Sequence, residues 1–142
     1  MPNIHPDHDH NVRCLVEALF TSIESGAKML DRHPELLHAT TEHRHETALH
    51  WLAVENHLEG VKFLLARDAK VDEPASSGDT ALMSASRLGY DDMCALLIRA
   101  GANVNAADEN EDSVLHHAAQ SGHIGVIKLL IASGANPLAK TH

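Results

Sequence analysis

The amino-acid sequence predicts an all-α solenoid, in which one helix–turn–helix unit is repeated along the chain. The first observation is a four-residue box that recurs with a period of 33 residues, at positions 47, 80 and 113. The second is that turn residues and leucine pairs keep nearly the same phase outside the box. A fixed period of this kind is typical of stacked supersecondary units. The residues in phase are Asn56, Gly89 and Gly122, followed by Leu64-Leu65, Leu96-Leu97 and Leu129-Leu130.

The third observation concerns composition and length. Hydrophobic residues make up 44% of the chain but aromatic residues only 3%, so the core must be aliphatic and alanine-rich. A chain of 142 residues is normally one domain. We expect a flexible, histidine-rich segment over residues 1–10 and a single domain over residues 11–142. The expected repeats cover about residues 11–41, 42–74, 75–107 and 108–139.

The first unit is degenerate, with two apolar helical segments at residues 15–19 and 27–31 and a register that is one residue longer. The later units follow a clearer pattern. In the third, Leu82, Ala85 and Ser86 lie at helical spacing on a short first helix. Thr80, like Thr47 before it, is a helix N-cap or first-turn residue that accepts a hydrogen bond from a free backbone N–H.

Each first helix ends at a residue that adopts the left-handed conformation readily, namely Gly89 or its equivalent Asn56. An apolar second helix follows and stops at Gly101 in the third unit and at Gly134 in the fourth. The linking segments, residues 71–79 and 104–112, are rich in Pro, Ser, Gly, Asp and Asn, which favours extended β-turn fingers.

This pattern resembles the ankyrin repeat family over about residues 42–139. The resemblance is carried by Thr47-Ala48-Leu49-His50, Leu115-His116-His117-Ala118-Ala119, Gly122-His123 and Gly101-Ala102-Asn103-Val104-Asn105-Ala106. Four positions depart from the family pattern. Met83 replaces the usual histidine, and Asp68, His45 and Glu111 stand where glycine is usual. A non-glycine residue at such a turn either stores strain or changes the turn.

The net charge and the lack of an apolar signal region limit the classes of function that the sequence allows. Eleven basic against twenty acidic residues give a net charge of −9 with histidine neutral, which disfavours binding to nucleic acid or to an anionic membrane. The N-terminus has no apolar signal region and no segment reaches membrane-spanning length, so we expect a cytoplasmic protein. Cys14 and Cys94 fall within helical apolar patterns, which favours buried free thiols over a disulfide or a reactive thiol.

The thirteen histidines raise the question of metal binding. The resemblance implies that His50, His116 and His123 are structural, with the first two holding their helix starts by hydrogen bonds. His5, His8 and His10 could chelate a metal weakly, but an ordering cost and the lack of supporting contacts favour a solvated tail. No phosphate loop, nucleophile elbow or Cys-x-x-Cys motif is present, so the sequence predicts no catalytic, cofactor or metal site.

The resemblance implies a protein-binding surface made of finger tips and the exposed flank of each first helix. Trp51 is left open as either a core residue or an interface anchor. The acidic finger at residues 108–112 is either an ordinary solvated loop or a steering element for a basic partner. Carried over by position, the predicted contact residues are His43, Arg44, Glu46, Trp51, Val54, Glu55, Ser76, Ser77, Asp79, Arg87, Leu88, Glu109, Asn110, Asp112, Gln120 and Ser121.

These observations predict a non-catalytic adaptor or inhibitor that binds another protein through the finger tips and the concave helix face. A narrower version is a toxin-neutralising, immunity-type protein. The alternative is a metal-buffering protein that uses the histidine-rich N-terminus. Ile124, Ile127, Leu130 and Ile131 also predict an apolar C-terminal edge, which either pairs with its own copy, docks the partner or is less exposed than the pattern suggests.

Overall fold

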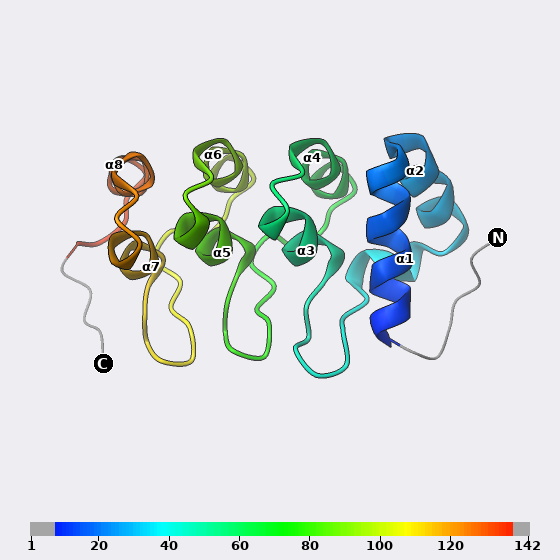
Figure 1. Ribbon diagram of the computed structural model, residues 1–142, viewed down its shortest axis with the longest axis horizontal. Coiled ribbons are helices and arrows are strands. Elements are labelled where there is room, and N and C mark those ends of the chain that lie inside the picture. The colour runs from blue at the N-terminus through cyan, green and yellow to red at the C-terminus, as the bar shows by residue number, and fades with distance from the viewer. Residues whose placement is uncertain (1–7, 138–142) are drawn as a thin grey trace.

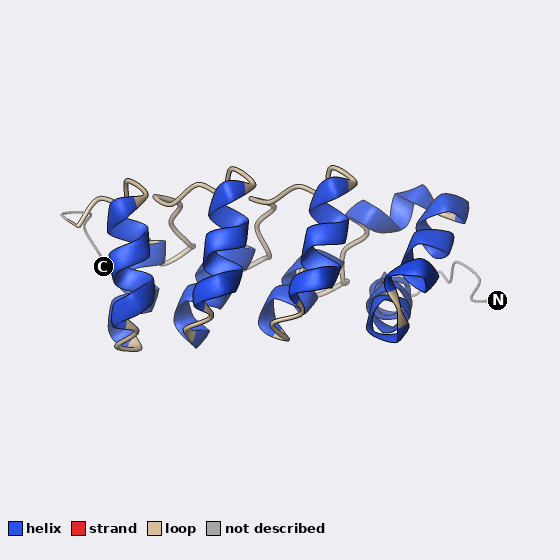
Figure 2. Cartoon of the chain, turned by 90° about the horizontal axis from the view of Figure 1, so that it is seen from above, coloured by secondary structure: helices blue, strands red, loops and turns tan. Residues whose placement is uncertain are grey.

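The predicted helical solenoid is confirmed by a computed structural model that describes residues 8–137. The helix pairs stand side by side in two rows, with extended fingers projecting on one side (Figures 1 and 2). Within the described residues the helices are α1 (His8–Thr21), α2 (Ile23–Arg32), the short 3-10 helix η1 (Pro34–His38), α3 (Ala48–Val54), α4 (Leu58–Ala66), α5 (Ala81–Leu88), α6 (Asp91–Arg99), α7 (Val114–Gln120) and α8 (Ile124–Ala132).

The first helix of each later unit (α3, α5 and α7) is called an inner helix below, and the second (α4, α6 and α8) an outer helix. The inner helices begin at hydroxyl N-caps, because Thr47, Thr80 and Ser113 accept hydrogen bonds from the third residue of their helices. In α3 the contact is reciprocal. The backbone N–H of Thr47 donates to Nδ1 of His50 at 2.9 Å. His116 accepts from Ser113 in the same way. This confirms the structural role predicted for both histidines.

The turns between paired helices use left-handed backbone, as the pattern predicts. Gly89 has a φ of 78° and Asn56 a φ of 56°. Gly89 is also required for space, because a Cβ there would lie 2.6 Å from the ring of His123. The same ring donates through Nε2 to the carbonyl of Arg87 at 3.0 Å, which confirms a structural role for His123.

The non-glycine residues at glycine positions keep the left-handed turn and carry its strain. The φ angles are 51° at His45, 69° at Asp68 and 64° at Glu111. A left-handed L-residue costs about 1–2 kcal/mol, so these turns store strain that Gly78, with a φ of 84°, avoids. The departures from the family pattern therefore do not change the local path of the chain at these residues.

The three fingers span residues 41–46, 75–79 and 108–112, and each closes by a backbone hydrogen bond of 2.9–3.0 Å from its first N–H to its last carbonyl. The first finger contains one residue more than the other two. The extra residue agrees with the register that is one residue longer between the first unit and the second.

The first unit differs from the later ones in the course of α1. This helix runs steeply across the direction of α3, α5 and α7. It is seen lengthwise in Figure 1, where they are seen nearly end-on, and it is seen end-on in Figure 2. It begins at His8, so the helix starts inside the segment expected to be flexible over residues 1–10. Residues 1–7 of that segment, including His5, lie outside the described residues.

The core is aliphatic, as the composition predicts, and runs as one cluster through all four helix pairs. Leu97 is fully buried in α6, whereas its neighbour Leu96 is only half-buried against the core. Cys94 is buried as predicted, but Cys14 is half-buried, with Sγ 3.3 Å from Nε2 of His10. The prediction of a buried thiol is therefore wrong for Cys14, and both cysteines are free thiols. No helix among the described residues is long and apolar enough to cross a membrane.

Candidate protein-binding surface

Hydrogen bonds between neighbouring fingers join them into one continuous edge. The backbone N–H of Ser76 donates to the carbonyl of Arg44 at 2.8 Å, and its hydroxyl donates to the carbonyl of His43 at 3.0 Å. In the next gap, the N–H of Glu109 donates to the carbonyl of Ser77 at 2.9 Å. The finger tips are thus fixed relative to one another, because each is bonded to the next by its backbone.

The residues predicted to contact a partner are all accessible to some degree. Four of them, Glu46, Trp51, Asp79 and Asp112, are half-buried. The others are exposed: His43, Arg44, Val54, Glu55, Ser76, Ser77, Arg87, Leu88, Glu109, Asn110, Gln120 and Ser121. The backbone bonds above bring residues of the second unit beside residues of the third, and residues of the third beside the fourth.

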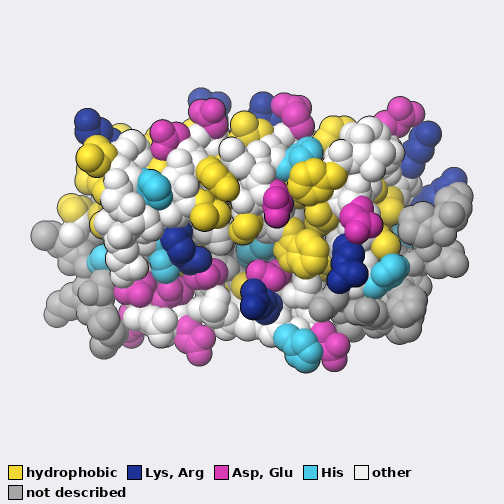
Figure 3. Space-filling model, in the orientation of Figure 1, with side chains coloured by type: hydrophobic (Ala, Val, Ile, Leu, Met, Phe, Trp, Pro, Cys, Tyr) yellow, Lys and Arg dark blue, Asp and Glu magenta, His cyan; other side chains and the backbone are white. Residues whose placement is uncertain are grey.

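Trp51, left open by the sequence between core and interface, is placed partly in the core. Its side chain packs against the core, yet the residue remains half-buried and keeps an accessible edge. Two exposed apolar residues lie at the ends of neighbouring inner helices, Val54 (42% exposed) on α3 and Leu88 (43%) on α5. Figure 3 shows hydrophobic side chains gathered over this part of the molecule.

Phe20 is an exposed apolar residue that the sequence reasoning missed. It is 49% exposed near the end of α1, and its ring meets the His57 ring edge-on with centroids 4.7 Å apart. A signal was available, because Val12, Leu15 and Leu19 mark the buried stripe of α1. Phe20 lies at the edge of that stripe, where helical spacing predicts partial exposure.

Charged side chains flank the apolar residues. Nη2 of Arg87 lies 3.1 Å from Oδ2 of Asp79, so two predicted contact residues form an ion pair with each other. In the third finger Glu109 and Glu111 are exposed and Asp112 is half-buried. Acidic side chains are grouped over this finger in Figure 3.

Asp108 has a structural role inside the acidic finger. Its Oδ1 accepts from the backbone N–H groups of Asn110 at 2.9 Å and Asp112 at 3.0 Å, while Oδ2 accepts from Nε2 of His117 at 2.9 Å. Burial acts to raise the pKa of Asp108, but the hydrogen bonds from Asp112, His117 and Asn110 outweigh it and lower that pKa. The finger is therefore neither a plain solvated loop nor uniformly exposed charge.

The C-terminal edge is only partly apolar and accessible. Leu130 is fully buried against the preceding unit and Ile127 is half-buried, while Ile124 is 65% and Ile131 47% exposed. Residues 138–142, which follow this edge in the sequence, lie outside the described residues. Helical spacing thus divides the apolar row of α8 between the core and the solvent.

An open hollow of about 430 Å³ lies at the other end of the solenoid, between α1 and α2. Its lining includes Cys14, Met29 and Arg32, and none of the predicted contact residues. Burial raises the pKa of the Cys14 thiol, and the Glu17 carboxylate adds to that rise against the opposing charge of Arg13. The hollow is therefore separate from the fingers.

Stacked helix pairs with hydrogen-bonded fingers define the class of helical repeat scaffolds, which have long binding surfaces in place of a deep active-site cleft. The family described as "Ankyrin repeats (3 copies)" matches residues 9–108 and 68–141, so this chain belongs to the ankyrin repeat family. Ankyrin repeats are generally protein–protein interaction modules.

A curated relative gives a more local match. Over 69 residues, 49% of this chain, the sequence is 42% identical to the "Ankyrin repeat and KH domain-containing protein mask-1" of Caenorhabditis elegans. The matched region spans 3% of that protein. The similarity thus covers half of this chain and a small part of a much longer protein.

Proposed function

We propose that this chain is a non-catalytic module that binds one protein partner through its finger tips and the flank of α3, α5 and α7, as an adaptor or inhibitor. The observation that supports this most directly is the row of inter-finger hydrogen bonds at 2.8–3.0 Å. A surface fixed before binding loses little conformational entropy when a partner docks. A toxin-neutralising role is a narrower form of the same proposal.

The chemistry of the surface supports a partner with a basic rim and an apolar centre. Val54, Leu88 and the open edge of Trp51 provide apolar contact area, and tryptophan is enriched among residues that dominate binding energy. Glu109, Glu111 and Asp112 place negative charge beside it. Such charge mainly raises the association rate of a basic partner.

The experiment begins with affinity capture on the intact chain and mass spectrometry, followed by binding measurements with the captured partner. Arg87→Ala combined with Leu88→Ala should weaken binding by about tenfold or more, while stability changes by less than about 0.5 kcal/mol. Glu59→Lys, at an exposed position on the outer helix α4, is the control for a charge change away from the fingers.

Charge reversal at Glu109, Glu111 and Asp112 should slow association at low salt and have little effect at high salt, since screening removes the steering field. Unchanged binding by the Arg87/Leu88 variant and by the charge-reversal variant at every salt concentration would place the interface on another face. Loss of binding by the Glu59→Lys variant, with binding by the other variants unchanged, would also place the interface on another face.

We also propose self-association through the C-terminal edge, supported by the exposure of Ile124 and Ile131. Apolar residues exposed together on one helix commonly mark an interface. Light scattering on the wild type and on a chain with Ile124→Gln and Ile131→Gln tests this. A wild type that stays monomeric at high concentration rules it out.

A further inference from the structure

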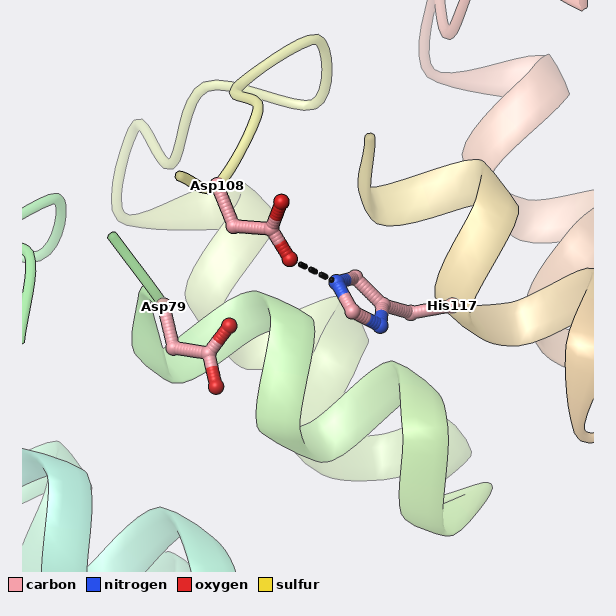
Figure 4. Close-up of side chains that lie close together, drawn as sticks. All are labelled: Asp79, Asp108 and His117. Carbon is pink, nitrogen blue, oxygen red and sulfur yellow. Dashed lines mark hydrogen bonds and ion pairs between the residues drawn. The ribbon is translucent and has the colours of Figure 1, made fainter. Parts of the chain in front are cut away.

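Two carboxylates and an imidazole from three separate segments meet between the second and third fingers. Asp79 ends the second finger, Asp108 begins the third, and His117 lies on α7 (Figure 4). One ligand atom from each lies within 4.8 Å of the other two. We propose that Asp79, Asp108 and His117 form a zinc-binding site that ties these fingers to α7.

The two inner ligands are buried and held in place. The side chain of His117 is 9% exposed and that of Asp108 is 6% exposed, against 25% for Asp79. Backbone N–H groups of Asn110 and Asp112 hold one oxygen of Asp108, which directs the other toward the imidazole. Supporting hydrogen bonds of this kind orient metal ligands in known sites.

The donor set suits zinc. One imidazole nitrogen with two carboxylate oxygens provides three protein ligands and leaves a fourth position for water. Bonds of about 2.0–2.2 Å in a tetrahedron place ligand atoms about 3.4 Å apart. The pair formed by Nε2 of His117 and Oδ2 of Asp108, now at 2.9 Å, must therefore open slightly as Asp79 moves inward.

A zinc ion would offset the negative charge of the two carboxylates, of which Asp79 already pairs with Arg87 at 3.1 Å between its Oδ2 and Nη2. That ion pair uses one oxygen of Asp79 and leaves the other for a ligand bond. Zinc replaces the hydrogen bond between Asp108 and His117 with two coordinate bonds, so Nε2 of His117 must give up its proton to solvent and the neutral imidazole carries its remaining proton on Nδ1.

The preceding interface provides an internal comparison. Thirty-three residues earlier, the positions of Asp79, Asp108 and His117 are occupied by Glu46, Ala75 and Ser84. Stacking of the second unit on the third therefore succeeds with one carboxylate and no imidazole. The three-residue cluster between the later fingers is not a requirement of repeat packing, which favours a ligand-binding role for it.

The test uses the full chain with His5, His8 and His10 changed to Ala, so that the N-terminal histidines contribute no signal. Zinc titration by calorimetry at neutral pH should show one bound ion per chain. Asp79→Asn and His117→Gln should each weaken binding by at least tenfold, by analogy with the 10–100-fold loss seen when supporting contacts are removed. Asp92→Asn and His38→Gln, at exposed positions outside the cluster, should bind zinc as the parent does.

Thermal melting provides a second measurement. Zinc should raise the melting temperature of the parent chain but not that of Asp79→Asn, because an ion that binds only the folded state stabilises it. Asp79 is partly exposed, so its substitution keeps the test valid even if the His117 variant does not fold. A parent chain that binds no zinc, or equal affinity in Asp79→Asn, overturns the proposal. The outcome is independent of partner binding.

Discussion

Leu97 provides the sharpest test of how the repeats hold together. It is fully buried in α6 and belongs to the core cluster that runs through neighbouring units. Leu97→Ala removes roughly three carbon groups at about 0.8 kcal/mol each, or about 2.4 kcal/mol of transfer free energy. The cavity left behind adds to this loss, so we expect a total of about 3–4 kcal/mol, within the usual range for buried leucines.

Urea unfolding followed by far-UV circular dichroism measures the effect. With an m-value of about 2 kcal/mol/M, a loss of 3 kcal/mol lowers the midpoint by about 1.5 M urea. Leu96→Ala should cost less because Leu96 is only half-buried. Leu88→Ala, at a residue 43% exposed, should change the free energy of unfolding by less than about 0.5 kcal/mol.

Two results would refute this reasoning. An unchanged midpoint for Leu97→Ala would mean that the residue does not pack as described. A first transition that unfolds only one helix pair, while the rest persists to higher urea, would mean that the units are energetically independent. A short stack with one shared core should instead unfold in a single transition.

The remaining predictions concern turns, pH and thiols. Gly89→Ala should lower the melting temperature more than Gly122→Ala does. Both glycines have a positive φ (78° and 73°), but a Cβ would clash with the His123 ring at Gly89 and would meet nothing within 4 Å at Gly122. Equal losses in melting temperature would contradict the close approach at Gly89. Burial lowers the pKa of His50, opposed by the backbone and charge of Glu73 and by the charge of Glu46. The stabilisation that neutral His50 gives the folded state is thus complete above the pKa of about 6.5 in the unfolded chain, and it is lost as the pH falls through the lower pKa of the folded chain. His50→Gln, which retains a capping-box residue, should flatten the decline in urea midpoint from pH 7 to pH 5, and an unchanged slope would exclude His50 as the cause. Burial raises the pKa of Cys94 to about 11, so a thiol reagent should modify Cys14 first and Cys94 only as the chain unfolds; Cys94 reacting first would show that its burial is wrong.

The helices and their ends could be predicted because the physics that sets them is local. A hydroxyl at Thr47 or Thr80 caps whichever helix follows it, and Gly89 or Asn56 turns the chain left-handed wherever it stands. Repetition adds the stacking, since an amphipathic helix pair buries its apolar face only against a copy of itself. Neither the caps nor the turns depend on contacts between residues distant in the sequence.

The features that could not be predicted depend on tertiary contacts between residues distant in the sequence. The steep course of α1 and the half-buried state of Trp51 follow from packing between units. Periodicity alone also does not distinguish Leu97, fully buried, from its half-buried neighbour Leu96. Nor does spacing along the chain bring Asp79, Asp108 and His117 together. Their meeting results from two fingers and a helix stacking side by side, and only the folded chain defines that proximity.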